Sequence, residues 1–173
     1  MNATASALTV RRGERLYVEL ADSKEAVREA QRLRYEVFGL EMGAQLKSGH
    51  LGIDADEYDA HCHHLLVRQT ADGRVIGCTR LLDQSGARQL GGWYSGSEFE
   101  LGPLGQLPGK MLEIGRTCVS PTARSGAVIA VLWSGLASFI HLQRVDYLFG
   151  CASMPLGEQD LQAAAIMNRL RRQ

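Results

Sequence analysis

The sequence has no excess of charge of either sign, because 19 Lys and Arg residues balance 19 Asp and Glu residues among its 173 positions. A protein that binds nucleic-acid phosphates usually carries a marked positive excess, so nucleic acid is not an expected partner. The composition is 45% hydrophobic and 22% charged, which is typical of a folded chain rather than a disordered one. At this length we expect residues 1–173 to form a single domain.

The sequence is also poor in cysteine and in long apolar runs. Its four cysteines are far apart and show no CxxC spacing, so we expect free thiols in a reducing compartment. The longest apolar run, 126–142, falls short of the ~20 residues that cross a bilayer. Arg11 and Arg12 follow the mildly apolar start, whereas a secretory signal places its charges first. We therefore expect a cytoplasmic protein without a transmembrane segment.

Signatures of several common enzyme classes are absent. There is no GxGxxG, GxxxxGK[ST] or GxSxG segment, so dinucleotide binding, P-loop hydrolysis and a serine-hydrolase nucleophile have no sequence support. The run His61-Cys-His-His64 contains metal-binding residue types, but alternation along a strand would turn His61 and His63 away from Cys62 and His64. We expect no bound metal, and we expect this run to open a strand at the rim of a site.

Hydrophobic periodicity predicts strands that are interspersed with helices. Asp72-Gly73 between two apolar runs predicts a hairpin, and Asp22 with Glu25 has the form of a helix capping box. Residues 125–143 are apolar nearly all round, which is typical of a central buried helix. The order of elements predicts an α/β domain with a mixed sheet. The expected strands are 15–20, 63–69, 75–82, 111–120 and 145–152, and the expected helices are 26–38, 125–143 and 160–172.

Two long segments have no clear period. The first, 39–61, is rich in glycine and aspartate and is predicted to be a loop. The second, 82–109, contains many glycines and two prolines, but also Trp93, Phe99 and Leu101. Long loops in compact domains are usually functional or disordered, and these interleaved apolar residues argue against disorder. We expect the second loop to pack over an apolar ligand.

The strand predicted over 111–120 carries two charges that the core would have to bury. Residues three apart on a regular strand face opposite sides, so Glu113 and Arg116 should diverge. Gly115 between them indicates a β-bulge, which would turn both towards one cleft. The alternative is a buried salt-bridge network with a structural role. The other charged residues expected in this set are Arg34, Arg80, Asp56 and Asp59.

Short segments around these residues recur in one order from about Leu33 to Ser153. They are Leu33-Arg-Tyr-Glu-Val-Phe38, Asp56-Glu-Tyr-Asp59, His64-Leu-Leu-Val67, Gly77-Cys-Thr-Arg80-Leu-Leu82, Tyr94-Ser95, Glu98-Phe99, Leu112-Glu113-Ile-Gly-Arg116, Leu132-Trp133 and Phe149-Gly-Cys-Ala-Ser153. This ordered set resembles the acyl-carrier-protein-dependent N-acyltransferases that make ornithine lipids. It is also similar, more distantly, to acyl-homoserine-lactone synthases.

The resemblance implies a GNAT-like fold, in which helices flank a central mixed sheet and a bulged strand splays from its neighbour to admit the donor's pantetheine arm. It implies transfer of a (3-hydroxy)fatty acyl group from an acyl-carrier-protein thioester to the α-amine of L-ornithine, giving lyso-ornithine lipid. Acyl carrier protein and ornithine would then be the partners. No tightly bound cofactor is implied, because the phosphopantetheine thioester is a co-substrate.

The same resemblance assigns roles to residues of this chain. Glu113, with Arg116 beside it, would be the catalytic carboxylate that takes the amine proton directly or through water. Backbone N–H groups at the bulge would stabilise the oxyanion. The helix after Arg124-Ser125-Gly126 would direct its N-terminus at the donor's phosphate. The substrate-binding residues would be Arg34, Arg80, Asp56 and Asp59 in the charged set, with Phe38 and Tyr94 along the acyl pocket.

The sequence departs from the resemblance at two places. CoA-dependent GNAT enzymes carry [RQ]xxGx[GA] before that helix, and Ala123 breaks the pattern, which is compatible with a carrier-protein donor. Ornithine-lipid enzymes continue with further strands where this chain ends at Gln173, so the strand near Val145 would present an open edge for a homodimer. The alternatives are an acyl-homoserine-lactone synthase that uses S-adenosylmethionine, or an inactive fragment that binds acyl carrier protein. Peripheral membrane contact is a further expectation.

Overall fold

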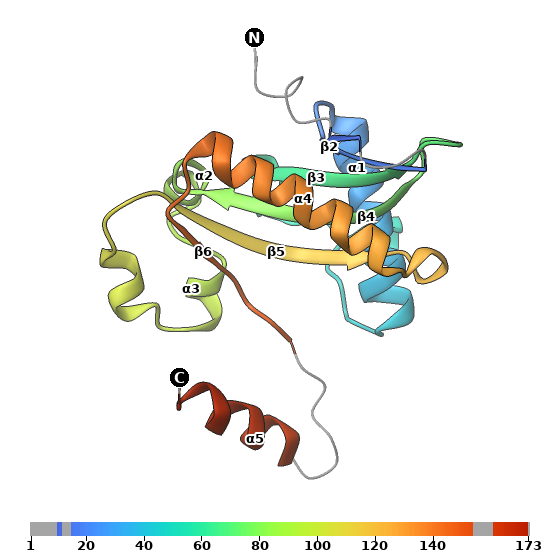
Figure 1. The fold of residues 1–173 in the computed structure, drawn as a ribbon. Coiled ribbons are helices and arrows are strands. Elements are labelled where there is room, and N and C mark those ends of the chain that lie inside the picture. The colour runs from blue at the N-terminus through green and yellow to red at the C-terminus, as the bar shows by residue number, and fades with distance from the viewer. Residues whose placement is uncertain (1–9, 12–14, 154–160, 173) are drawn as a thin grey trace.

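A computed structural model describes residues 10–11, 15–153 and 161–172. Its central feature is a six-stranded sheet whose strands lie side by side in chain order (Figure 1). Neighbouring strands are antiparallel, except that β5 and β6 are parallel, so the mixed sheet expected from the sequence is confirmed. The strands are β1 (Val10–Arg11), β2 (Leu16–Leu20), β3 (His63–Gln69), β4 (Val75–Asp83), β5 (Met111–Val119) and β6 (Tyr147–Phe149).

Helices cover both faces of this sheet. The long helix α4 (Gly126–Gln143) crosses one face, and α1 (Lys24–Arg34) lies on the other (Figure 1). Side chains alternate along each strand and so supply both cores: Leu65 and Val67 pack with α4, whereas Leu66 packs with α1. Burial of these apolar side chains holds the three layers together.

The first helix begins one residue later than the sequence indicates. Its N-cap is Ser23 and not Asp22, because the Ser23 hydroxyl accepts a hydrogen bond from the Ala26 N–H at 3.2 Å. After Arg34 the chain continues as a π-helical segment, η2 (Tyr35–Glu41). The helix predicted over 26–38 therefore exists, but it changes type in its last turns.

The segment predicted as a loop over 39–61 contains two 3₁₀ helices, η3 (Gly49–Leu51) and η4 (Glu57–His61). A capping box fixes the start of η4. The Asp56 carboxylate accepts from the Tyr58 N–H at 3.0 Å, and the Asp56 N–H donates to the Asp59 carboxylate at 3.3 Å. The spacing of these two aspartates is therefore set locally, before any tertiary contact.

The hairpin predicted at Asp72-Gly73 joins β3 to β4. Gly73 has φ 71°, a left-handed conformation that glycine adopts without strain, and its N–H donates to the Gln69 carbonyl at 2.9 Å. The turn pairs β3 with β4 over their whole length. This places the end of β4, which carries Arg80, beside the start of β3 and η4.

The segment 82–109 is not a structureless loop, contrary to the sequence prediction. It forms the short helices α2 (Gln84–Gln89) and α3 (Ser95–Glu98) and the 3₁₀ helix η5 (Gly102–Gln106). Asp83 caps α2 by accepting a hydrogen bond from the Gly86 N–H at 2.8 Å. Helices this short, with glycine inside them, lack the apolar period from which helices were predicted.

Helix α4 is not the central buried helix that its composition predicts. Leu132, Leu136 and Phe139 pack on the sheet, but Ile129 and Trp133 are 40% and 51% exposed. The helix contains no charged residue, so composition could not distinguish one covered face from two. Among the described residues it is the one helix long and apolar enough to cross a membrane, and 33% of that stretch is buried within the domain.

The parallel pair β5–β6 is short and ends in a divergence. The strand expected over 145–152 is only Tyr147–Phe149, and it pairs with Met111–Glu113. Beyond that point β5 continues, whereas the chain after β6 leaves it (Figure 1). Gly150 lies at the parting, where a Cβ would collide with the Ile114 carbonyl oxygen. Within the described ranges β6 is the edge of the sheet.

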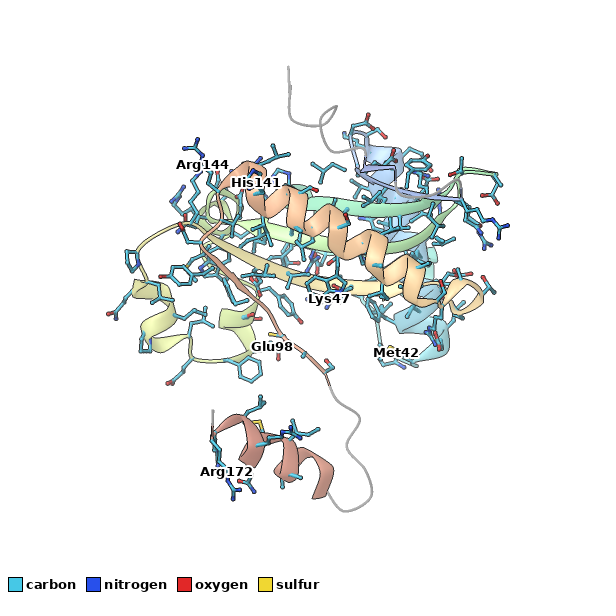
Figure 2. All side chains as sticks on the ribbon, viewed as in Figure 1. Met42, Lys47, Glu98, His141, Arg144 and Arg172 are labelled. Carbon is cyan, nitrogen blue, oxygen red and sulfur yellow. The ribbon has the colours of Figure 1, made fainter. Side chains whose placement is uncertain are left out.

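The remaining helices lie at the two ends of α4. A 3₁₀ turn, η6 (Pro121–Ala123), leads from β5 into α4. Helix α5 (Leu161–Leu170) corresponds to the helix predicted over 160–172, and residue 160 lies outside the described residues. Figure 2 shows Arg172, just after α5, well away from the sheet.

Candidate active site

A β-bulge interrupts β5 beside the two charges predicted on it. The pairing with β4 shifts register so that two residues, Arg116 and Thr117, lie opposite the single residue Thr79. Arg116 has φ 51°, a left-handed conformation that costs a non-glycine residue about 1–2 kcal/mol. The bulge is where the sequence predicts it, but the strained backbone belongs to Arg116 and not to Gly115.

Six charged side chains form a closed ring beside this bulge. Each of three arginines contacts two aspartates, and each aspartate contacts two arginines, so the ring is neutral. The N–O distances around it are Arg34–Asp54 3.2 Å, Asp54–Arg116 3.1 Å, Arg116–Asp56 3.8 Å, Asp56–Arg80 2.6 Å, Arg80–Asp59 2.9 Å and Asp59–Arg34 2.7 Å.

The ring is buried unevenly. Four of its side chains are at most 5% exposed, whereas Asp56 is 16% and Arg116 is 27% exposed. Buried charges persist only when they are paired, and removal of one partner leaves a costly isolated charge. The inner four residues therefore have a structural role here, and Arg116 is the ring member that a ligand can reach most easily.

The inner arginines keep the Asp59 carboxylate ionised. Burial would raise the pKa of Asp59, but hydrogen bonds and positive charge from Arg34 and Arg80 outweigh burial and hold this pKa below its usual range. Arg34 donates to both Asp59 oxygens, at 3.0 and 2.7 Å, and to the Asp54 backbone carbonyl. The Nε atoms of Arg34 and Arg116 approach Asp54 Oδ2 without the alignment of a hydrogen bond, so those contacts are ion pairs.

Glu113 stands outside the ring and is itself buried, at 4% exposed. Its carboxylate accepts hydrogen bonds from the Tyr94 N–H at 2.8 Å, the Ser95 N–H at 2.7 Å and the Ser95 hydroxyl at 2.5 Å. Glu113 therefore caps α3 and fixes the segment 82–109 against β5. The Ser95 hydroxyl also lies 3.2 Å from the exposed thiol of Cys151, just after β6.

Glu113 and Arg116 meet through Tyr94 and not through a direct ion pair. The backbone of Tyr94 donates to Glu113, and the Arg116 guanidinium lies 5.4 Å from the centre of the Tyr94 ring. The Tyr94 hydroxyl donates to Glu98 at 3.3 Å. Tyr94 thus joins the buried carboxylate, the exposed arginine and an exposed carboxylate at the point where β5 and β6 separate.

Tyr58 is a second aromatic residue of the site that the sequence analysis did not single out. Its ring meets the Tyr94 ring edge-on at 5.5 Å, and the Arg80 guanidinium lies 5.5 Å from its centre. Burial, and then the negative charge of Glu57, raises the pKa of Tyr58. Asp54 and Ser95 were also missed as site residues. Tyr58 and Ser95 both stand in the quoted segments, whereas nothing in the pattern marked Asp54.

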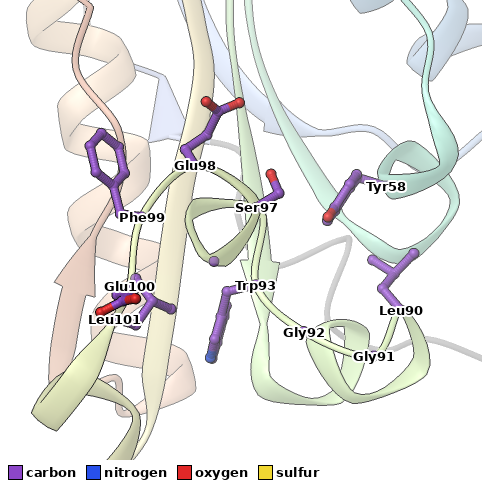
Figure 3. A pocket seen from close by; sticks show the side chains of 11 residues that line it. Tyr58, Leu90, Gly91, Gly92, Trp93, Ser97, Glu98, Phe99, Glu100 and Leu101 are labelled. Carbon is purple, nitrogen blue, oxygen red and sulfur yellow. The ribbon is translucent and has the colours of Figure 1, made fainter.

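A hollow of about 710 Å³ opens beside Tyr58. Tyr58 reaches it from η4, and Trp93, Glu98 and Leu101 reach it from the segment around α3 (Figure 3). The Trp93 ring also meets Phe149 of β6 edge-on at 5.0 Å, which fixes one wall to the sheet. The hollow has apolar walls, as expected of a segment that packs over an apolar group, and it also has acidic residues at its rim.

Two sets of predicted residues lie away from Tyr94. Phe38 of η2 packs against the core beneath α1 and is not among the residues that line the hollow. Arg124 precedes α4 and forms a two-pronged ion pair with Glu41, at 2.7 and 2.5 Å. Ser125 is the extended residue before α4 and Gly126 its first residue. Their proposed part in binding the donor stays a prediction.

The histidine run is dispersed, as strand alternation requires. His61 contacts Gln89, His63 lies 3.4 Å from Asp83, and the buried His64 contacts the Asp59 carbonyl at 3.1 Å. Burial raises the pKa of the Cys62 thiol to about 12. Within the described part of the chain, no three His, Cys, Asp or Glu side chains are placed to hold a metal ion.

Comparison with known proteins agrees with this geometry. The sequence model of the acetyltransferase (GNAT) domain matches residues 33–134, which span α1 to the middle of α4 and include the whole ring. The chain belongs to the GNAT family. The GNAT-like fold expected from the sequence, a central mixed sheet flanked by helices, is thereby shown.

Curated GNAT relatives are similar over most of this chain. The L-ornithine N(alpha)-acyltransferase of Rhizobium meliloti is 40% identical over 149 residues, which are 81% of this chain and 50% of that protein. The enzyme of the same name from Agrobacterium fabrum is 35% identical over 160 residues, 87% of this chain and 55% of that protein. The chain therefore spans about half the length of the curated relatives that it matches.

Solved structures share the fold at low sequence identity. The acyl-homoserine-lactone synthase LasI superposes with a TM-score of 0.60 at 19% identity, over 91% of this chain and 78% of that one. FeeM, an N-acyl amino acid synthase from uncultured soil microbes, gives 0.54 at 13% identity, over 78% and 69%. Identity this low supports the fold alone.

Proposed function

We propose that the protein transfers a fatty acyl group from an acyl-carrier-protein thioester to the α-amine of L-ornithine. The observation that carries the proposal is the arrangement around Tyr94, where a buried carboxylate and an exposed guanidinium flank one aromatic ring as β5 and β6 separate. The relatives named L-ornithine N(alpha)-acyltransferase supply the acceptor. The carrier-protein donor follows from the interrupted CoA pattern before α4.

Glu113 takes the proton that the amine loses. An α-amine has a pKa near 8 and is mostly protonated at neutral pH, so its attack on a thioester needs a base. Both oxygens of Glu113 already accept hydrogen bonds, and the Ser95 hydroxyl is one of the donors. The amine proton passes to the Ser95 oxygen while the Ser95 hydrogen passes to Glu113. Collapse of the tetrahedral intermediate breaks the C–S bond, and the proton on Glu113 returns by way of Ser95 to the leaving thiolate.

Arg116 binds the carboxylate of the acceptor. Its Nη2 lies 3.8 Å from Asp56, longer than a hydrogen bond, so part of its planar edge remains for a second carboxylate. The left-handed backbone of the bulge presents this edge towards Tyr94. In this account Asp56 and Asp59 hold Arg116 and Arg80 in place, and they do not contact the substrate amine.

The donor enters where β5 and β6 diverge. The first turn of α4 offers backbone N–H groups to the phosphate of the pantetheine arm, next to Ser125 and Gly126. The acyl chain packs against Trp93 and Phe149, whose rings connect the hollow to the divergence. Use of a carrier-protein donor places the reaction in the cytoplasm. Peripheral membrane contact and pairing of two chains through the β6 edge are further parts of this proposal.

The direct test incubates the purified protein with 3-hydroxyacyl carrier protein and a panel of amino acids, and follows thiol release and product mass. We expect thiol release that depends on ornithine, an N-acyl-ornithine product, and faster transfer from long-chain than from acetyl donors. A lactone product that requires S-adenosylmethionine would instead identify a homoserine-lactone synthase. Binding of the carrier protein without thiol release would identify an inactive binding domain.

A further inference from the structure

The carboxylates around Tyr94 differ in how far their charge is compensated. Asp54, Asp56 and Asp59 are each shared between two arginines of the ring. Glu113 is buried and accepts three hydrogen bonds from the start of α3. These four carboxylates have their partners within the protein, so they offer little to an incoming cation.

Glu98 is the exception in direct contact with Tyr94. It is exposed, it ends α3, and its hydrogen-bond partner is the Tyr94 hydroxyl at 3.3 Å. No Lys, Arg or His nitrogen among the described residues lies within ion-pair distance of it. Figure 3 shows its carboxylate at the rim of the hollow that Tyr58 and Trp93 line. An uncompensated carboxylate beside aromatic rings suits an organic ammonium ion.

Tyr94 also sets the position of Glu98 relative to Arg116. One guanidinium stacks on its ring, and one carboxylate accepts from its hydroxyl, so opposite charges stand at two sides of one rigid side chain. An amino acid whose α-carboxylate binds Arg116 therefore extends its side chain along Tyr94 towards Glu98. A side chain that ends in an ammonium group completes an ion pair there, and a neutral side chain does not.

We propose that Glu98 binds the side-chain ammonium group of the acceptor and makes the enzyme prefer diamino acids to amino acids with neutral side chains. The inference rests on the proposed N-acyltransferase function and adds a residue that selects the acceptor. Glu98 makes no contact with Glu113 or Ser95, so it acts on recognition and not on proton transfer.

The test compares ornithine with norvaline, which has the same carbon chain without the terminal amine. We expect the wild type to favour ornithine about tenfold in kcat/KM, as for one partly exposed charge-assisted hydrogen bond. Glu98→Gln keeps an oxygen that accepts from the Tyr94 hydroxyl but removes the charge. It should raise KM for ornithine about tenfold and change the kinetics with norvaline by less than twofold.

A matched control is Glu57→Gln, an exposed carboxylate next to Tyr58 that does not line the hollow. It should leave the ornithine-to-norvaline ratio unchanged. An E98Q variant that loses both substrates equally, or a wild type that acylates both equally, would overturn the role of Glu98 and leave the acyltransferase function intact. A collapse of the ratio in Glu100→Gln instead of E98Q would also overturn it. Failure of the wild type to acylate either amino acid would overturn the proposed function itself.

Discussion

The charged ring and the surroundings of Tyr94 are neighbours that treat charge in opposite ways. In the ring, three arginines and three aspartates compensate one another, and four of the six are almost wholly buried. Around Tyr94, the edge of Arg116 and the carboxylate of Glu98 lack a full set of partners. The difference separates charges that hold the fold from charges that are available to a substrate.

Loss of Asp59 should break the ring with the largest effect on stability. Asp59→Ala leaves Arg34 and Arg80 buried without their shared partner, so we expect a loss of about 3–5 kcal/mol in the free energy of unfolding, measured with urea. Glu57→Ala, an exposed change on the same short helix, should cost less than about 0.5 kcal/mol. Equal losses in the two variants would show that the ring does not stabilise the domain.

Loss of the Glu113 charge should affect activity more than folding. Glu113→Gln removes the proton acceptor, so we expect kcat to fall by about 10²–10⁴, measured as thiol release. An amide cannot accept all three of the hydrogen bonds, so unfolding free energy should fall by about 1–2 kcal/mol while the protein stays folded. Unchanged turnover in a folded variant would remove Glu113 from the mechanism.

The buried His64 should make the ring side of the domain sensitive to mild acid. Burial lowers the pKa of His64 despite its contact with the Asp59 carbonyl. Below the ordinary histidine pKa of about 6.5 the unfolded chain binds a proton that the native chain does not, so stability falls as pH falls. This residue should contribute a slope of at most about 1.4 kcal/mol per pH unit between pH 6.5 and 5.

The substitution that checks this slope is His64→Gln, with the exposed His50→Gln as its control. Urea unfolding at pH 7, 6 and 5 should show a flatter pH dependence in H64Q than in H50Q. The same slope in both variants would place the acid sensitivity elsewhere in the molecule.

Much of the fold could be predicted from the sequence because its signals are local. The Asp72-Gly73 turn and the alternation in β3 and β4 fixed the hairpin, and Gly115 correctly pointed to a bulge in β5. The predictions failed where structure depends on tertiary partners. The apolar surface of α4 could not reveal that one face stays uncovered, and α2 and α3 are held by Asp83 and Glu113 and not by an apolar period.

The candidate site was predictable as a list of residues but not as a geometry. The sequence marked Glu113, Arg116, Arg34, Arg80, Asp56 and Asp59 as charges in apolar surroundings. Ring closure requires Asp54, which lies in a segment without periodicity, and the separation of Glu113 from the ring depends on hydrogen bonds to α3. Pairing across such distances in sequence is set by the folded sheet, so composition and spacing could not reveal it.

The most direct test compares two arginines of the same ring, Arg80→Ala and Arg116→Ala, each assayed for urea stability and for the ornithine KM of the folded fraction. The account predicts that R80A lowers stability by several kcal/mol, whereas R116A, being half-exposed, costs far less stability and raises KM at least tenfold. The contrary result, with equal stability losses and a normal ornithine KM in R116A, would contradict the division between structural and substrate-binding charge.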